Sequence, residues 1–245
     1  MTVYIFDPED YTVDSNPTDA WEVRNGFAPP VIKEDADGKY MLLEPTSGDS
    51  INVVESLLIP ADKQDIDVVC LFQPEPGEEE TSFGLETFVR GSNLSDPSLI
   101  SNFNAGANIF VFSFFTTRNN LMREISEGST SSLGTSAAGA SGDNFTRFVR
   151  FNVTGNTVRA KFWEPPDLEP FEWSIEYTTD AFTAGKIGLS SHLNRQRSIR
   201  IRWYSVGSDG DNAVKHNPQE DPGTVKNKVV TETSSTSVEL SWTQP

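Results

Sequence analysis

The stretch FNVTGNTVRAKFW, residues 151–163, limits what this chain can fold into more than any other stretch does. Two runs of alternating side chains meet at Gly155-Asn156, a two-residue loop of the kind that joins neighbouring antiparallel strands. Successive side chains of a strand point to opposite faces of its sheet, so the second run has one face suited to a core. That face carries Val158, Ala160 and Phe162. The stretch therefore predicts a β-hairpin.

The same period of two recurs along most of the chain. The runs are rich in Val, Ile, Phe and Trp and are bounded by Gly, Pro, Asn and Asp, which is typical of strands. They are Ile66–Phe72, Phe83–Arg90, Asn108–Phe115, Phe148–Val153, Val158–Trp163, Trp173–Tyr177, Lys186–Ser190 and Ile199–Val206. Asn119–Glu127 is the only weak candidate for a helix. The pattern predicts an all-β fold, an antiparallel sandwich of two sheets.

Charge and cysteine content exclude several classes of protein. The chain has 245 residues and a formal net charge of -17, and such an acidic chain repels phosphate backbones and anionic lipid surfaces. We therefore expect no nucleic acid partner and no membrane insertion.

Cys70 is the only cysteine, and its alternation with Val68 and Phe72 predicts a small buried side chain. Neither a secretory signal nor an apolar run of ~20 residues is visible, so we expect synthesis in the cytoplasm without a signal peptide.

Two segments differ from the strand-like runs. Residues 128–144 are a low-complexity stretch of small residues, which predicts a surface loop with little share in the core. Residues 211–227 are polar and contain prolines, which predicts a linker. The chain accordingly divides into a domain at 1–210, a linker at 211–227 and a C-terminal strand segment at 228–245.

Four motifs follow one another in the second half of the predicted domain. They are Arg159-Ala160-Lys161-Phe162-Trp163, Glu169-Pro170-Phe171-Glu172-Trp173, Gly185-Lys186-Ile187-Gly188-Leu189 and Gly207-Ser208-Asp209-Gly210. In this order they resemble the laminin-G-like domains of the concanavalin A-like lectin/glucanase superfamily, in particular those of tailed-phage minor tail and fibre proteins. The first half resembles these domains more loosely, at Trp21, Gly26, 37–40, 65–72 and 89–92. The resemblance implies a jelly-roll sandwich over residues 1–210.

One departure from the family pattern affects its ligands. Family members often carry acidic residues in the closing strand, where this sequence has Arg202 and Trp203. The resemblance therefore does not extend to a ligand or ion that uses those acids.

The C-terminal segment resembles a different family. TETSSTSVELSWTQP resembles the opening strands of a fibronectin type III domain, and Val238, Leu240 and Trp242 alternate as in a strand. A segment this short cannot form such a domain, which needs about 100 residues. Two interpretations follow: the natural chain continues, or the segment packs as an added strand on the main domain or on a neighbouring subunit.

The sequence offers little that is typical of a catalytic site. Hydrolases of the same superfamily use a Glu-x-Asp-x-x-Glu strand, which is absent here. Glu164, Asp167 and Glu169 stand in a proline-rich turn, where we expect them to be solvated or paired with cations rather than to have a raised pKa. His192 and His216 are the only histidines, and no Gly-x-Ser-x-Gly motif accompanies them. We therefore predict that the chain is not an enzyme.

Metal binding is restricted to calcium by the available ligands. One cysteine and two distant histidines cannot form a zinc site. Loop carboxylates can hold calcium, and Asp209 with Asp211 is the pair that we assign as the candidate site. Further acidic clusters lie at 7–10 and 35–37. The prediction is no cofactor, with structural Ca2+ as the alternative.

The second face of the 158–163 strand is the candidate carbohydrate-binding surface. Arg159, Lys161 and Trp163 share that face, and Trp173 follows on the next strand. Aromatic rings stack on sugar faces while polar neighbours bind the hydroxyl groups. The alternative is that Trp163 covers the end of the sheet or packs against a loop.

Together these features predict a non-enzymatic structural or attachment protein of a tailed-phage virion, in the tail, tail tip or fibre. The expected partners are other virion proteins, further copies of the chain and host surface polysaccharide. Two alternatives stay open: a lectin module unrelated to a virion, and a glycoside hydrolase of the same superfamily.

Overall fold

The computed structural model describes residues 2–46, 52–60, 63–76, 84–92, 108–115, 119–126, 129–138, 146–180, 184–191, 198–215, 231–234 and 237–239. Within these ranges the chain consists of strands, turns and one 3-10 turn, η1 (Pro8–Asp10). No helix in the described part is long and apolar enough to cross a membrane. The prediction of an all-β fold is confirmed.

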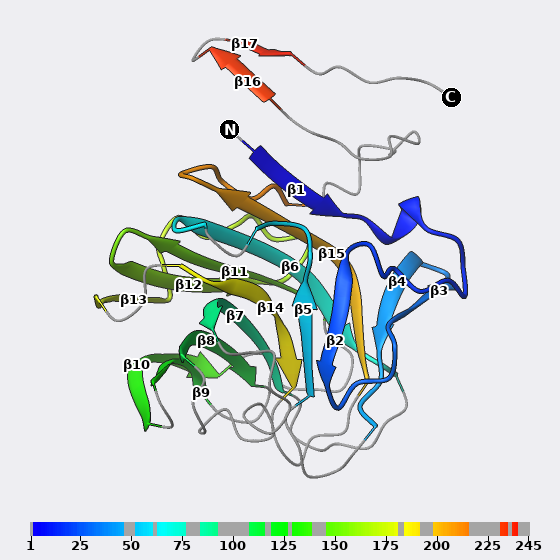
Figure 1. The fold of residues 1–245 in the computed structure, drawn as a ribbon, viewed down its shortest axis with the longest axis horizontal. Helices are drawn as coiled ribbons and strands as arrows, with labels where there is room; N and C mark the ends of the chain where they lie inside the picture. Colours follow the sequence, from blue (N-terminus) through cyan, green and yellow to red (C-terminus); the bar gives the residue numbers. More distant parts are fainter. Residues whose placement is uncertain are drawn as a thin grey trace.

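An eight-stranded antiparallel sheet forms one layer, in the order β13-β12-β11-β6-β15-β4-β3 with β1 paired to β15 (Figure 1). Its strands are β1 (Thr2–Phe6), β3 (Val31–Asp35), β4 (Gly38–Leu43), β6 (Ile66–Pro74), β11 (Arg147–Thr154), β12 (Thr157–Trp163), β13 (Ile175–Thr178) and β15 (Ile199–Ser208). Strand β6 lies between β11 and β15, so this sheet combines segments from both halves of the chain.

A seven-stranded antiparallel sheet forms the second layer, in the order β10-β9-β8-β7-β14-β5-β2. Its strands are β2 (Trp21–Asn25), β5 (Asn52–Ser56), β7 (Gly84–Ser92), β8 (Asn108–Phe115), β9 (Asn119–Ser126), β10 (Ser129–Ala138) and β14 (Lys186–Ser191). The neighbours β7 and β14 are also distant in sequence, which gives the crossed connections of a jelly roll.

The core lies between the two sheets and is built by the alternation that the sequence shows. Val68, Cys70 and Phe72 of β6 are fully buried in it, together with apolar side chains of β5 and β14. Cys70 is thus a small buried side chain, as predicted, and burial raises the pKa of its thiol. Trp21 contacts Tyr204 edge-on with ring centroids 4.8 Å apart, which links the two sheets.

The predicted hairpin and the eight predicted strands are confirmed, with ends that differ by a few residues. Thr154 and Thr157 are register partners, so the loop consists of Gly155 and Asn156. Gly155 has a φ of 56°, a left-handed conformation that costs glycine little. Nothing lies within 4 Å of the position that a Cβ would occupy there.

The weak helix candidate at 119–127 is a strand, and one prediction about local structure is wrong. Residues 119–126 form strand β9 instead of a helix, because pairing with β8 on one side and β10 on the other outweighs the local pattern. Residues 129–138, predicted as part of a surface loop, form the edge strand β10. Its one large apolar residue, Leu133, is only 8% exposed and packs in the core. Small residues suit an edge strand that offers few other side chains to the core.

The C-terminal segment contains a separate two-stranded antiparallel sheet. Strand β16 (Thr231–Ser234) pairs with β17 (Ser237–Glu239), which includes Val238. Leu240 and Trp242 lie outside the described residues. The resemblance to a fibronectin type III domain and the domain boundaries stay predictions.

Candidate functional site

The outer face of the eight-stranded sheet, which points away from the core, holds the residues that the sequence singled out. An apolar cluster covers part of this face. It comprises Val69, Leu71, Phe148, Trp163, Trp203 and Ala213, with Ile5 packed against them. Trp163 stacks on Phe148 with ring centroids 5.0 Å apart, and it is only 5% exposed. Trp163 therefore packs within the protein and offers a ligand little surface.

The two cations beside Trp163 are held by internal contacts. Lys161 Nζ lies 2.8 Å from Glu169 Oε1 and donates a hydrogen bond of 2.7 Å to the Pro170 carbonyl oxygen. Arg159 donates to Asn152 Oδ1 at 3.0 Å and lies 3.9 Å from Glu176, its register partner. The sequence alone leaves open whether the cations of β12 face Glu172, Ser174 or Glu176 on the following strand. The structure brings Arg159 to Glu176, and it pairs Lys161 with Glu169.

Trp173 packs over these two cations. The Lys161 ammonium lies 4.5 Å from the centre of the Trp173 ring, and the Arg159 guanidinium lies 4.9 Å from it. Both distances are typical of cation–π contacts. Trp173 thus ties the end of the 164–174 loop to the sheet. A role of Trp163, Lys161, Arg159 and Trp173 in sugar binding stays a prediction.

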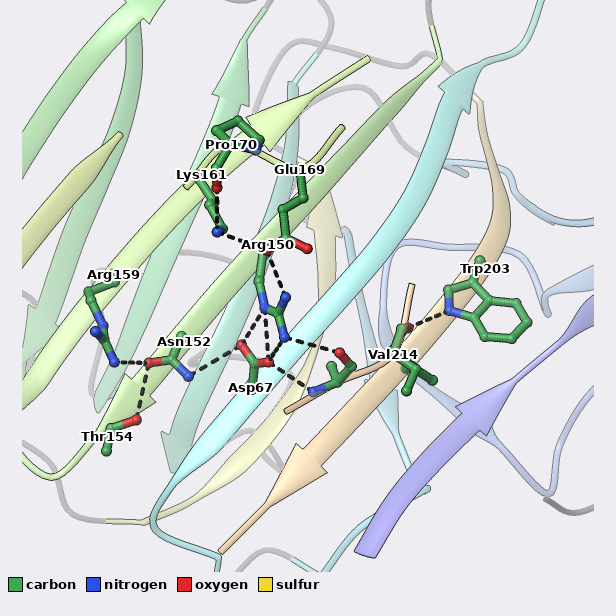
Figure 2. Close-up of polar contacts among 12 residues, drawn as sticks. Asp67, Arg150, Asn152, Thr154, Arg159, Lys161, Glu169, Pro170, Trp203 and Val214 are labelled. Carbon is green, nitrogen blue, oxygen red and sulfur yellow. Dashed lines mark hydrogen bonds and ion pairs between the residues drawn. The ribbon is translucent and has the colours of Figure 1, made fainter. Parts of the chain in front are cut away.

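Arg150 on β11 connects the sheet to two segments that cross its outer face (Figure 2). Its guanidinium donates to both oxygens of the buried Asp67 carboxylate, from Nε at 3.1 and 2.9 Å and from Nη2 at 2.5 Å. Its Nη1 donates to Glu169 at 2.7 Å, and its Nη2 donates to the Ala213 carbonyl oxygen at 3.0 Å. Burial lowers the pKa of Arg150, but the hydrogen bonds and charges of Asp67 and Glu169 outweigh burial and raise it.

The segment 211–215, part of the predicted linker, lies against the same face. Asp67 accepts a hydrogen bond of 2.8 Å from the Ala213 N–H. Trp203 Nε1 donates to the Val214 carbonyl oxygen at 2.9 Å, and Ser205 Oγ donates to the same oxygen. Buried polar groups of the sheet therefore hold the backbone of Ala213 and Val214, and the assignment of 211–227 as a linker stays a prediction.

Arg202 and Trp203, where the family pattern has acids, both have structural partners. Arg202 donates to Asp35 Oδ2 at 2.6 Å and stacks over Tyr40. Trp203 belongs to the apolar cluster. A β-bulge between Ile201 and Trp203 puts the side chains of Arg202 and Trp203 outside the core.

The 164–174 loop is the most exposed apolar feature of this face. Among the described residues, its Leu168 is 85% exposed and its Phe171 is 92% exposed, more than any other large apolar side chain. Leu168 lies between the anchors at Glu164, which forms an ion pair with Arg147, and at Glu169. Phe171 lies between Glu169 and Trp173, which packs over the cations of β12. The carboxylates were expected to be solvated or paired, and Glu164 and Glu169 are paired.

Glu169 is the central anchor of the loop. Burial raises its pKa, but hydrogen bonds and charges from Lys161 and Arg150 outweigh burial and lower it, so the carboxylate stays ionised.

Sequence reasoning missed both Phe171 and the Arg150–Asp67 pair. The available signals were apolar residues inside an acidic proline-rich turn, and charged residues at outward positions of two otherwise apolar strands.

The candidate calcium residues have partners in the protein. Asp209, with a φ of 58°, lies 2.6 Å from Lys63 Nζ through its carboxylate. Asp211 is only 7% exposed and accepts a hydrogen bond from the Thr2 N–H. Within the described part of the chain, no three His, Cys, Asp or Glu residues group as metal ligands. Structural calcium stays a prediction, and His192 and His216 lie outside the described residues.

Comparison with solved structures identifies the fold of the sandwich. A Bacillus subtilis protein of unknown function with a galectin-like fold aligns with a TM-score of 0.59 at 16% identity, over 88% of this chain and 97% of that one. The fold is a galectin-like, concanavalin A-like jelly roll. The carbohydrate-binding module CBM66 from Bacillus subtilis aligns with a TM-score of 0.51 at 12% identity, over 81% and 96% of the two chains.

The exoplasmic/lumenal domain of VIP36 in its Ca2+/Man-bound form is a further structural neighbour. It aligns with a TM-score of 0.58 at 13% identity, over 94% of this chain and 98% of that one. No protein-family model matches the chain, and no curated protein matches its sequence. At these identities the likeness establishes the fold.

Proposed function

We propose that this chain is a non-enzymatic, lectin-like attachment module that binds carbohydrate through the 164–174 loop, with Phe171 as the stacking residue. The observation that carries the proposal is the 92% exposure of Phe171 on a loop whose neighbouring residues are fixed to the sheet. An exposed aromatic ring is a suitable surface for the apolar face of a sugar ring. Because Lys161 and Arg150 already hold Glu169, little conformational freedom is lost when a ligand binds.

The setting that we propose is a tailed-phage virion, with other virion proteins as partners. This part rests on the resemblance of the ordered motifs at 159–210 to domains of phage tail and fibre proteins. The lectin fold is compatible with a role in host attachment, and it is equally compatible with a lectin module outside a virion. An electron-microscopy map of an intact particle distinguishes the two settings, since the chain must occupy density in the tail.

The absence of catalysis is part of the proposal. A glycosidase needs a carboxylic acid with a raised pKa, whereas the pKa of Glu169 is lowered. Glu172 is exposed at the loop surface, where water solvates its carboxylate. Turnover of a β-glucan that is lost on replacing Glu169 or Glu172 would contradict this part of the proposal.

A glycan array tests the binding function directly. We expect the wild-type chain to bind at least one glycan class, and we expect Phe171→Ala to reduce that binding at least tenfold. Leu57→Ala is the matched control, because Leu57 is 40% exposed and follows β5 of the seven-stranded sheet, whereas the loop joins β12 and β13 of the eight-stranded sheet. Binding that Phe171→Ala leaves unchanged would contradict the proposed site, and a silent array would contradict the proposed function.

A further inference from the structure

The surface around Phe171 is acidic. Residues 164–180 are all described, and they include no lysine or arginine. Their carboxylates belong to Glu164, Asp167, Glu169, Glu172, Glu176 and Asp180. A ligand that contacts the exposed loop therefore meets negative charge from the loop itself.

Three cations of the neighbouring strands are buried in ion pairs beneath this surface, and Arg159, whose side chain is 28% exposed, lies near Glu176 and over Trp173. The side chains of Arg147, Arg150 and Lys161 are 7%, 13% and 8% exposed, and each is paired with Glu164 or Glu169. These ion pairs use the cations beneath the loop to hold it in place. They leave the outer carboxylates to determine the charge that a ligand encounters.

Asp167 and Glu172 are the carboxylates that flank the apolar tip. Both residues are exposed, and they stand on either side of Leu168 and Phe171 in the sequence. Glu172 forms no ion pair or hydrogen bond with the described residues. The tip thus combines an aromatic ring, an aliphatic side chain and two exposed carboxylates, of which Asp167 also interacts electrostatically with Arg147.

We propose that this loop prefers sugars that carry protonated amines, accepts neutral sugars more weakly, and rejects sugars that carry carboxylate, sulfate or phosphate groups. The proposal rests on the proposed carbohydrate-binding function and names its ligand class. An ammonium group next to the stacked sugar ring is attracted by the carboxylates and by the face of the Phe171 ring. An anionic group at the same position is repelled by the same carboxylates.

The size of the selectivity follows from Coulomb attraction at a hydrated surface. One ammonium and one carboxylate about 6 Å apart in water gain enough to change affinity about threefold, so two carboxylates give roughly tenfold. Salt weakens this preference because the Debye length falls to ~8 Å at physiological ionic strength.

The test uses three β-1,4-linked oligomers of equal length, made of glucosamine, glucose and glucuronate. Binding is measured by calorimetry at about pH 5.5, where carboxylates with ordinary pKa values are ionised, and at low and physiological salt. The variants are Phe171→Ala and the pair Asp167→Asn with Glu172→Gln. The matched control is Glu34→Gln with Glu44→Gln, which removes two exposed carboxylates near the opposite edge of the same sheet.

We expect the glucosamine oligomer to bind about tenfold more tightly than the glucose oligomer, and the glucuronate oligomer to bind most weakly. The double variant Asp167→Asn/Glu172→Gln should remove the difference in affinity between the glucosamine and glucose oligomers. The control double variant Glu34→Gln/Glu44→Gln should preserve that difference. Glucuronate binding as tight as glucose binding would overturn the selectivity and leave the function standing. Glucosamine binding that survives Phe171→Ala would also overturn the proposed selectivity of the loop. Such binding would reflect only the attraction between the ammonium groups and the net charge of -17. If no oligomer or array glycan binds, the proposed function itself fails.

Discussion

Replacing Glu169 with glutamine should lower the free energy of unfolding by about 2 kcal/mol. The carboxylate accepts a charge-assisted hydrogen bond from Arg150 at 2.7 Å and lies 2.8 Å from the Lys161 ammonium. Glutamine keeps the shape of the side chain and one oxygen acceptor, but it loses the charge. The change therefore tests the ion pairs that anchor the 164–174 loop with little effect on packing.

The magnitude follows from the local geometry. A hydrogen bond to a charged group contributes about 1.5–3 kcal/mol, so two such bonds set an upper limit of roughly 6 kcal/mol. Both cations keep other partners in the variant, since Arg150 retains Asp67 and Lys161 retains the Pro170 carbonyl oxygen. Glutamine also keeps one acceptor, and the Glu169 side chain is 17% exposed, so water replaces part of the loss. These offsets reduce the expected effect to about 1–3 kcal/mol.

Urea denaturation of the wild type and of Glu169→Gln measures the difference. Glu172→Gln serves as the control, and we expect it to stay within about 0.5 kcal/mol of the wild type because Glu172 is exposed. A Glu169→Gln variant as stable as this control would refute the argument that Arg150 and Lys161 anchor the loop through Glu169.

The pH dependence gives a second test of the same anchor. The pKa of Glu169 is lowered in the folded protein, so its stabilising contribution is complete above its unfolded pKa of ~4.3. The contribution is lost as the pH falls through the lower, folded pKa. The stability difference between wild type and Glu169→Gln should therefore be full at pH 7 and should shrink below about pH 4. A difference that is unchanged at low pH would contradict the electrostatic origin.

Two further predictions concern the packing of the outer face. Trp163→Ala should lower the free energy of unfolding by about 3–5 kcal/mol, because it removes a buried ring stacked on Phe148. Urea denaturation measures the change, and a loss of less than about 1 kcal/mol would contradict this packing. Gly207→Ala should lower the free energy of unfolding by about 1–3 kcal/mol in the same assay, because the added Cβ would overlap the backbone of Asp211 and Asn212. Unchanged stability would mean that segment 211–215 does not lie on the sheet.

Local alternation explains why most strands could be predicted. Side chains of a strand alternate strictly, so buried strands such as β6 show their core face directly in the sequence. The loop at Gly155-Asn156 was predictable for a similar reason, since a two-residue loop restricts the residues that can occupy it. Strand β10 was not predictable, because its Ser, Thr and Gly residues carry almost no pattern and it is a strand only by pairing with β9.

The β-bulge in β15 shows a second limit of sequence reasoning. Ile199 and Ile201 face the core at odd positions, whereas Tyr204 and Val206 face it at even positions. The shift occurs at Arg202, which has no register partner on β6, since Ile201 pairs with Phe72 and Trp203 pairs with Leu71. Only the partner strand reveals such a skip, since alternation within one strand does not say where an extra residue is accommodated.

The sequence by itself determined the all-β class, the hairpin and the core face of β12, because these depend on interactions between near neighbours in the chain. Only the tertiary structure decided which aromatic side chain reaches solvent. Trp163 is buried in the apolar cluster with Phe148 and Trp203, whereas Phe171 lies on a loop anchored through Arg150. The physical reason is that exposure depends on what covers a surface, and here the covering segments come from elsewhere in the chain.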